Sequence, residues 1–351
     1  MERVYGVRKR DVSVFTYQLA SLTRAGVPIL RALSLIFEQT ERRGFAQIVG
    51  ELRDQIRDGK ALSEAMSQYP SLFDTLYLSM VRSGEKAGVL DEVLYRLAEY
   101  REREWELRQK VRNALTYPLL IISVGVVSVF VILTFFLPRV ITLLEEMGQS
   151  LPRSTKILIE VSRFVSGHWL WFLIALGLIL IAFGKGKPGS RKKWVMDAIR
   201  LHIPFVRRFT RAEEIVRFAR TMSLLLKNGL HVYESLELAI DTLNNDLLKE
   251  ELKEVSREIV EQGSTLSENL KEKGIFPNFV VNMLAVGEEG GRLEESLEEI
   301  AHSYEREVEQ MIKMSTSLLE PLLILVVGVV VGFIVYALLL PIFNMNMGIA
   351  R

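Results

Sequence analysis

The stretch SGEKAGVLDEVL, residues 83–94, returns 203 positions later as VGEEGGRLEESL, residues 286–297. The shared positions include two glycines, two leucines and the glutamate pair Glu85 and Glu288, and the offset also pairs Phe15 with Phe218 and Gly26 with Gly229. Self-similarity at a fixed period is typical of a duplicated structural unit. We therefore interpret the chain as a tandem repeat in which each copy is a soluble helical domain followed by one membrane span.

Composition narrows the possible functions. The chain has 351 residues, with 44 Lys and Arg against 43 Asp and Glu, so no polyanionic partner such as nucleic acid is indicated. It has no cysteine, which excludes disulfides, thiolate catalysis and Cys-ligated metal centres.

Three apolar segments interrupt the charged sequence. Residues 119–137 and 322–340 contain no charged residue, and a proline lies on either side of each segment. About 20 helical residues cross the hydrocarbon core of a bilayer. A shorter apolar run covers 168–183, with Trp169 and Trp171 as interfacial anchors. The sequence therefore predicts three transmembrane helices, at 114–138, 164–183 and 318–343.

The middle span belongs to neither copy of the repeat, and it returns the chain to the side from which it started. Basic residues concentrate before the first span and after the second. Positive charge marks cytoplasmic segments. We expect two cytoplasmic domains, 1–113 and 184–317, with the loop 139–163 and the tail 344–351 outside the cytoplasm.

The soluble domains show helical periodicity and no convincing strand alternation. Phe15, Leu19 and Leu22 recur at i, i+4 and i+7, as do their counterparts Phe218, Met222 and Leu225. After the first repeated motif, Leu90, Val93, Leu94, Leu97 and Ala98 form an apolar stripe. The expected fold class is all-α, a polytopic membrane protein with two cytoplasmic bundles of about six helices each.

The repeated motif itself has two interpretations. In the first it is a structural corner: one helix stops at Gly84, Gly88 permits a tight backbone, and Asp91 lies in the first turn of the next helix. This interpretation leaves Glu85 and Glu288, which we expect in the turn, without a role. In the second interpretation these two acids contact a partner protein or a metal ion.

Catalytic and transport motifs are missing from the sequence. The four histidines are scattered, and there is no nucleotide-binding or hydrolase signature. Glu320, at the edge of the last span, is the only charged residue within the predicted spans, which disfavours an ion or proton pathway. We expect a protein that is not an enzyme and requires no cofactor. Gly328 and Gly332 form a GxxxG pair in the last span, which predicts close helix packing or self-association, with a homodimer preferred.

Taken together, the motifs resemble the GspF/PilC family of inner-membrane platform proteins from type II secretion systems and type IV pili. The resemblance lies in GExxGxL in both copies, YP before the first span, EP before the last, and LPRSTKIL at residues 151–158. It covers roughly residues 11–345. It implies a platform of a type II secretion system or, as the alternative, of a type IV pilus. A transporter subunit and an unrelated membrane scaffold remain as alternative functions from other classes of protein.

The resemblance also implies partners and a site. A cytoplasmic ATPase would engage the soluble domains, and pilins or pseudopilins would be extracted from the membrane and polymerised, together with other inner-membrane assembly proteins. The implied location is the bacterial inner membrane, with a cytoplasmic N-terminus and an extracytoplasmic C-terminus. Some family members bind Ca²⁺ on the first domain, and the matching positions here are Glu38 and Asp91.

Overall fold

The computed structural model describes residues 7, 9–146, 157–160, 162–164, 167 and 204–348, and this part of the chain is helical apart from its turns and loops. The described residues within 1–109 and 188–308 form one compact unit. Those within 110–187 and 309–351 form a second unit, which contains the apolar segments.

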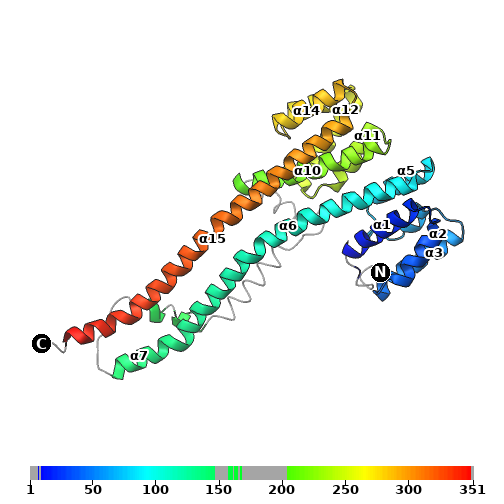
Figure 1. Cartoon of the computed structure of the whole chain (residues 1–351). Coiled ribbons are helices and arrows are strands. Elements are labelled where there is room, and N and C mark those ends of the chain that lie inside the picture. The colour runs from blue at the N-terminus through cyan, green and yellow to red at the C-terminus, as the bar shows by residue number, and fades with distance from the viewer. Residues whose placement is uncertain are drawn as a thin grey trace. The chain divides into compact units, whose positions relative to one another are not determined.

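The first repeat is a series of short helices followed by a long one. The short helices are α1 (Lys9–Arg24), α2 (Ile29–Gln39), α3 (Arg43–Arg57), α4 (Leu62–Met66) and α5 (Thr75–Ala87). The long helix α6 runs over Leu90–Val131 and continues into the second unit (Figure 1).

The second repeat has the same series: α10 (Pro204–Lys227), α11 (Val232–Thr242), α12 (Asp246–Gln262), α13 (Leu266–Lys273), α14 (Asn278–Glu289) and the long α15 (Leu293–Gly348). Helices α11, α12, α14 and α15 begin 203 residues after α2, α3, α5 and α6. The duplication read from a few residues therefore extends to the boundaries of the helices.

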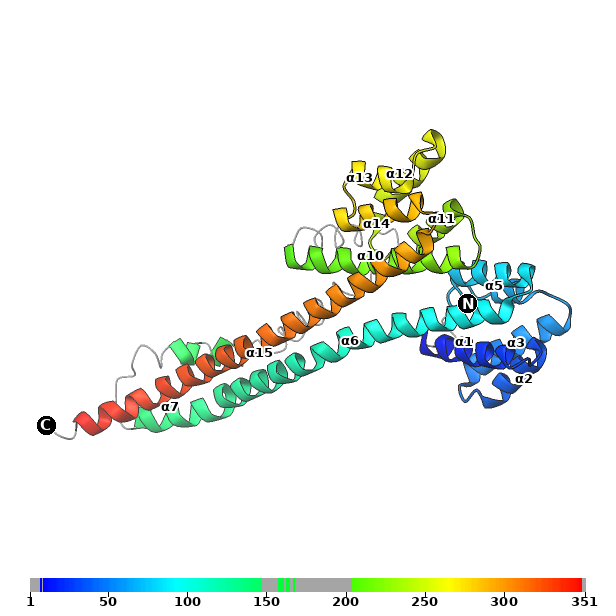
Figure 2. The ribbon, with the colours of Figure 1, turned by 45° about the horizontal axis from the view of Figure 1, so that its top comes forward.

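The core of the first unit confirms the apolar stripe after the repeated motif. Val93, Leu94, Leu97 and Ala98 are buried together with the aromatic side chains of Phe15 and Phe73. The same cluster includes Leu225 of α10, with Leu238 of α11 packed against it, so the two repeats share one apolar contact. In Figures 1 and 2, α6 runs between α1 on one side and α10 on the other.

The second unit contains the ends of α6 and α15. Both helices are long and apolar enough to cross a membrane, and only 11% of each apolar window is buried. This result agrees with two of the three predicted spans. The third, 164–183, lies almost entirely outside the described residues, as does LPRSTKIL.

The first span ends differently from the last. A π-helical turn, η2 (Ile132–Phe136), follows α6 and precedes α7 (Leu137–Glu146), in which Pro138 lies. A π turn adds a residue to one turn of a helix and so interrupts its regular hydrogen bonding. The counterpart segment of the last span continues as α-helix. The helix reaches Glu146, so the predicted loop 139–163 begins as helix.

Candidate functional site: the repeated corner and the contact between the repeats

The Glu85 carboxylate caps the short helix α4. One of its oxygens accepts a hydrogen bond from the Leu62 N–H, and the other accepts from the N–H and the hydroxyl of Ser63, at 3.2 and 2.5 Å. The first N–H groups of a helix have no partner inside the helix, and the helix dipole favours a negative charge at this end. Ala61, the N-cap residue of α4, supplies no side-chain bond, so Glu85 takes that role from another helix.

Glu288 holds the same position in the second repeat. Its two oxygens accept from the N–H groups of Leu266 and Ser267 at 2.8 and 3.0 Å, at the start of α13. Here the N-cap residue Thr265 also forms a capping box with Glu268. Helix α13 therefore has two capping devices where α4 has one.

Gly84 allows helices α5 and α6 to approach closely. A Cβ atom at this position would lie 2.9 Å from the nearest side-chain carbon of Val93, and one at Gly287 would lie 2.6 Å from the Ser296 hydroxyl. The expectation that the first helix stops at Gly84 was wrong, because α5 continues to Ala87. The stop is Gly88, whose φ of 71° is in the left-handed region that glycine tolerates.

The structure thus gives the glycines and glutamates of the repeated spacing GExxGxL a folding role. Glu85 and Glu288 lie in the last turn of a helix, where we expected them in the turn itself, because the helix runs further than the glycine suggested. Their hydrogen bonds are made within the chain. Contact of these two acids with a partner protein stays a prediction.

The other predicted site residues are less closely supported. Glu38 is near the end of α2 and Asp91 is in the first turn of α6. Within the described residues, no group of three or more His, Asp or Glu side chains could hold a metal ion. Because calcium prefers six or more oxygen ligands, we derive no function from the Glu38 and Asp91 pair.

The GxxxG pair of the last span faces open space in the described structure, since a Cβ atom at Gly328 or Gly332 meets nothing within 4 Å. The close approach between the spans is instead at Gly125, where a Cβ would lie 3.0 Å from Val327. A role for Gly328 and Gly332 in self-association stays a prediction.

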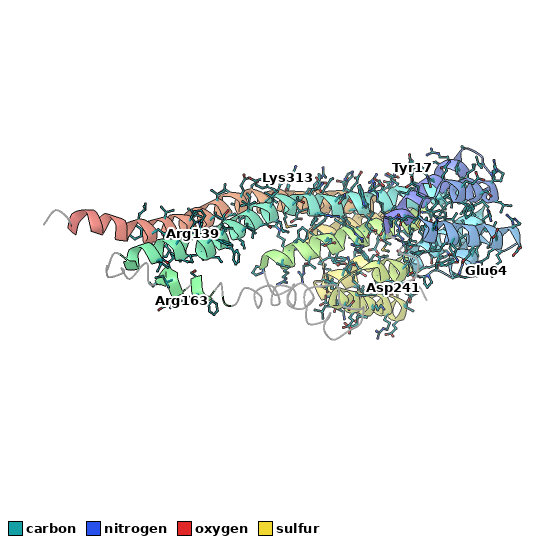
Figure 3. All side chains as sticks on the ribbon, turned by 90° about the horizontal axis from the view of Figure 1, so that it is seen from below. Tyr17, Glu64, Arg139, Arg163, Asp241 and Lys313 are labelled. Atoms are coloured by element: carbon teal, nitrogen blue, oxygen red, sulfur yellow. The ribbon has the colours of Figure 1, made fainter. Side chains whose placement is uncertain are left out.

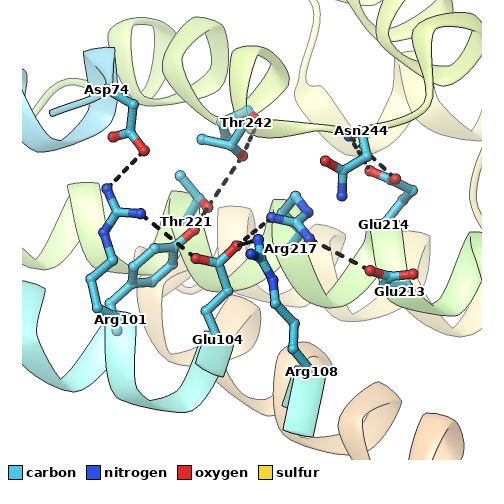
Figure 4. Close-up of polar contacts among 12 residues, drawn as sticks. Asp74, Arg101, Glu104, Arg108, Glu213, Glu214, Arg217, Thr221, Thr242 and Asn244 are labelled. Atoms are coloured by element: carbon cyan, nitrogen blue, oxygen red, sulfur yellow. Dashed lines mark hydrogen bonds and ion pairs between the residues drawn. The ribbon is translucent and has the colours of Figure 1, made fainter. Parts of the chain in front are cut away.

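A network of ion pairs joins α6 of the first repeat to α10 of the second, and sequence reasoning missed it (Figure 4). Glu104 of α6 accepts from Arg217 of α10 at 2.8 Å and from Arg108 at 2.6 Å. Arg101, one turn earlier on α6, pairs with the α5 residue Asp74 at 2.8 Å. The side chains of Arg101 and Arg217 are each only 12% exposed.

Charge and burial act in opposite directions on Glu104. Burial alone would raise the pKa of this carboxyl, but the guanidinium groups of Arg217 and Arg108 outweigh it and hold the pKa at about 2. Glu104 is therefore ionised at neutral pH. A neutral hydrogen bond beside it, between the Tyr100 and Thr221 hydroxyls at 3.1 Å, also links α6 to α10 and is buried.

A second buried acid, Glu214 of α10, lies on the other side of Arg217. It accepts backbone N–H bonds from Asn244 and Asn245 at 3.0 and 3.2 Å, and so fixes the connection between α11 and α12. Burial raises the pKa of Glu214 to about 7, although Arg217 and the backbone donors oppose the shift. Its counterpart in the first repeat, Asp11, pairs with Arg42.

The described site has no arrangement of a nucleophile with a base, and its ionised groups are held in pairs that join helices. Its geometry is that of a structural element: capped corners, close glycine contacts and a fixed contact between two repeats. The fold and this site define a duplicated helical protein with two helices long and apolar enough to cross a membrane.

The comparisons agree with that class. The family described as "Type II secretion system (T2SS), protein F" matches the chain twice, over residues 15–138 and 218–341, and the chain belongs to this family. The two matches are offset by the 203 residues of the repeat.

Relatives are similar over nearly the whole chain. The type IV pilus assembly protein PilC of Thermus thermophilus is 36% identical, over 98% of this chain and 84% of the relative. The type II secretion system protein F of Aeromonas hydrophila is 34% identical, over 97% and 88%. The protein of the same name from Vibrio cholerae is 32% identical, over 97% and 84%.

Proposed function

We propose that this protein is the inner-membrane platform of a type II secretion system, coupling a cytoplasmic assembly ATPase to the polymerisation of pseudopilins. The observation that carries the proposal is the match of both repeats to one family, with similarity to secretion and pilus proteins along nearly the entire chain. A platform of a type IV pilus is the second candidate, favoured by the 36% identity to a pilus assembly protein.

The proposed architecture has three spans and two six-helix cytoplasmic bundles. Two apolar helices and the duplicated series of helices support it, together with the basic residues next to the spans. In this topology both repeats face the cytoplasm, while the loop and the C-terminus lie on the outer side. An ATPase would then have two related surfaces available on the same side of the membrane.

We infer a role that is not enzymatic. Two described acids with large pKa shifts, Glu104 and Glu214, are held in contacts to other elements of the fold. The energy for moving pilins or pseudopilins would come from the ATPase, and other inner-membrane assembly proteins would complete the machine. The nearly unburied apolar helices supply surface for contact with the apolar helices of such subunits.

Deletion and complementation in the source cell test the proposal. We expect deletion to abolish secretion of the type II substrates, and the full chain to restore it. Restoration of piliation alone would favour the pilus candidate. The platform assignment is wrong if deletion affects neither secretion nor piliation and the protein does not bind the active ATPase of either system in a detergent pull-down.

The same pull-down separates docking from folding at the corner. Glu85→Ala and Glu288→Ala should each be compared with wild type at a temperature below the melting transition of all three proteins. Weaker ATPase binding by a folded variant would support partner contact by these acids. Unchanged binding would leave them with capping alone.

A further inference from the structure

A groove between α1 and α6 exposes aromatic side chains in the first repeat. Its volume is about 500 Å³, and it is lined by Arg10, Val14, Tyr17, Tyr95, Glu99 and Trp105 among others. Tyr17 is 63% exposed and Val14 47% exposed, and Figure 3 marks Tyr17 on α1. Exposed apolar side chains gathered in one place are typical of a protein contact surface.

The second repeat has the corresponding groove, between α10 and α15, and there it is covered by a helix. Arg96, Tyr100 and Arg103 of α6 line one cleft together with Arg220 of α10 and Glu298 of α15. Arg96 also donates to the backbone carbonyl of Lys227 at 2.6 Å. The last helix of the first repeat therefore sits against the groove formed by the first and last helices of the second.

The repeat offset identifies the same positions in the open groove. Arg220 corresponds to Tyr17, and Glu298 corresponds to Tyr95, while Thr221 corresponds to Gln18. Thr221 is fully buried beneath α6, whereas Gln18 is only half-buried. The α1 face thus has an aromatic surface at the positions where the α10 face is covered by another helix.

The face of the first repeat that covers this groove also has a counterpart, formed by α14 and α15 of the second repeat. The first repeat contacts the second through α5 and α6, and Leu76 of α5 is 3% exposed in the apolar cluster that also includes Leu225 of α10. The counterpart of Leu76 on α14 is Phe279, which is 46% exposed. The counterparts of Arg96 and Arg103 on α15 are Glu299 and Arg306, which are both exposed and pair with each other at 3.6 Å.

We propose that the α14–α15 face of a second copy of this chain docks into the α1–α6 groove, repeating between molecules the contact that joins the two repeats within one molecule. Such a head-to-tail contact differs from a two-fold dimer, because each molecule contributes two different faces. It closes into a ring or continues as an open array, depending on the rotation per molecule.

Charge complementarity supports a second copy as the occupant. Within the molecule Arg96 contacts the backbone carbonyl of Lys227; the corresponding positions between molecules are Glu299 and Arg24, whose side chains carry opposite charges. The positions that correspond to Arg103 and Arg220 are Arg306 and Tyr17, a guanidinium opposite an aromatic ring. Arg24 already stacks over the Tyr95 ring at 4.2 Å, so the groove favours such cation–π contacts.

Cysteine cross-linking can test the contact directly, because the chain has no cysteine of its own. Two differently tagged full-length chains, one carrying Tyr17→Cys and the other Arg306→Cys, would be co-expressed and oxidised in native membranes. We expect a disulfide-linked dimer containing both tags. Either variant expressed alone should give no disulfide dimer, since a head-to-tail contact brings unlike positions together.

A matched pair of exposed positions, Glu64→Cys on one chain and Asp241→Cys on the other, measures random collision. A yield for Tyr17 with Arg306 no higher than for this pair overturns the proposal. So does a strong dimer from Tyr17→Cys alone, which would indicate a two-fold contact.

Truncation of the aromatic anchor gives an independent measurement. We expect Tyr17→Ala to weaken self-association in detergent by about thirtyfold, the effect of losing one strong aromatic contact, with an unchanged melting temperature because Tyr17 is exposed. Glu64→Ala is the control and should leave self-association unchanged. Intact self-association of Tyr17→Ala, combined with loss of secretion, would assign the groove to a different protein and overturn the proposal.

Discussion

Removal of the Glu85 carboxylate should destabilise the first repeat more than removal of Glu288 destabilises the second. Glu85 accepts two backbone N–H bonds and one hydroxyl bond at a helix whose N-cap residue provides no bond of its own. Loss of a helix cap costs about 1 kcal/mol, and a hydrogen bond to a charged group contributes about 1.5–3 kcal/mol. Because these effects overlap, we expect Glu85→Ala to lower the free energy of unfolding by about 2–3 kcal/mol.

Glu288→Ala should cost only about 1 kcal/mol, because the Thr265 and Glu268 capping box still holds the start of α13. Hydrogen exchange measured by mass spectrometry can resolve the two sites in one protein. In Glu85→Ala the amides of Leu62 and Ser63 should lose protection, while those of α13 remain as in wild type. Thermal melting in detergent gives the global effect.

The matched variant Glu85→Gln keeps one acceptor oxygen but places an amide NH₂ towards backbone donors, so its effect should lie near that of alanine. Equal destabilisation by Glu85→Ala and Glu288→Ala would refute the argument from the capping box. Unchanged exchange at α4 in Glu85→Ala would refute the capping role itself.

Three further predictions concern the contacts between helices. Glu104→Gln should destabilise the protein by about 2 kcal/mol, a low value for a broken ion pair because the carboxylate keeps some solvent contact. Because the pKa of Glu104 is lowered to about 2, its ion pairs stabilise the wild-type protein fully above about pH 4.3, and this stabilisation is lost as the pH falls towards 2. Acid unfolding of the wild type and the variant measures the loss. The raised pKa of Glu214, about 7, has the opposite effect on the pH dependence of stability: stability is greatest below about pH 4.3 and falls as the pH rises through 7. In melts at pH 5 and pH 8, Glu214→Gln should therefore not show this decrease. Gly84→Ala and Gly287→Ala should each lower the free energy of unfolding by about 2 kcal/mol through overpacking. Gly328 has open space around it, so Gly328→Ala should leave the melting temperature unchanged. Equal effects at all three glycines would contradict the packing argument.

The repeat, the helical class and the apolar core stripe could be predicted from sequence because each depends on periodicity. The same offset pairs Gly88 with Gly291, and both glycines have the positive φ of a left-handed turn. Helix boundaries near the motif were less certain. Gly84 was placed at a helix end because glycine commonly stops helices, whereas its role here is to admit a neighbouring helix, which no local pattern reveals.

The contact between the repeats could not be read in this way, because it joins residues more than 100 positions apart. A signal was nevertheless present in the differences between the copies. Arg217 stands where the first repeat has Val14, and Thr221 stands where it has Gln18. At these two positions the copies differ in side chain, and the second copy is covered where the first is more exposed.

The π turn at Ile132–Phe136 has a geometric consequence for the duplicated spans. One residue of an α-helix accounts for about 100° of rotation, so an added residue turns everything that follows by about that angle. From Leu137 onward, the first span therefore presents a different side to its surroundings than its copy does at the same sequence positions. The two spans are alike in sequence where they begin and inequivalent in azimuth at their far ends, so the two copies present distinct surfaces there.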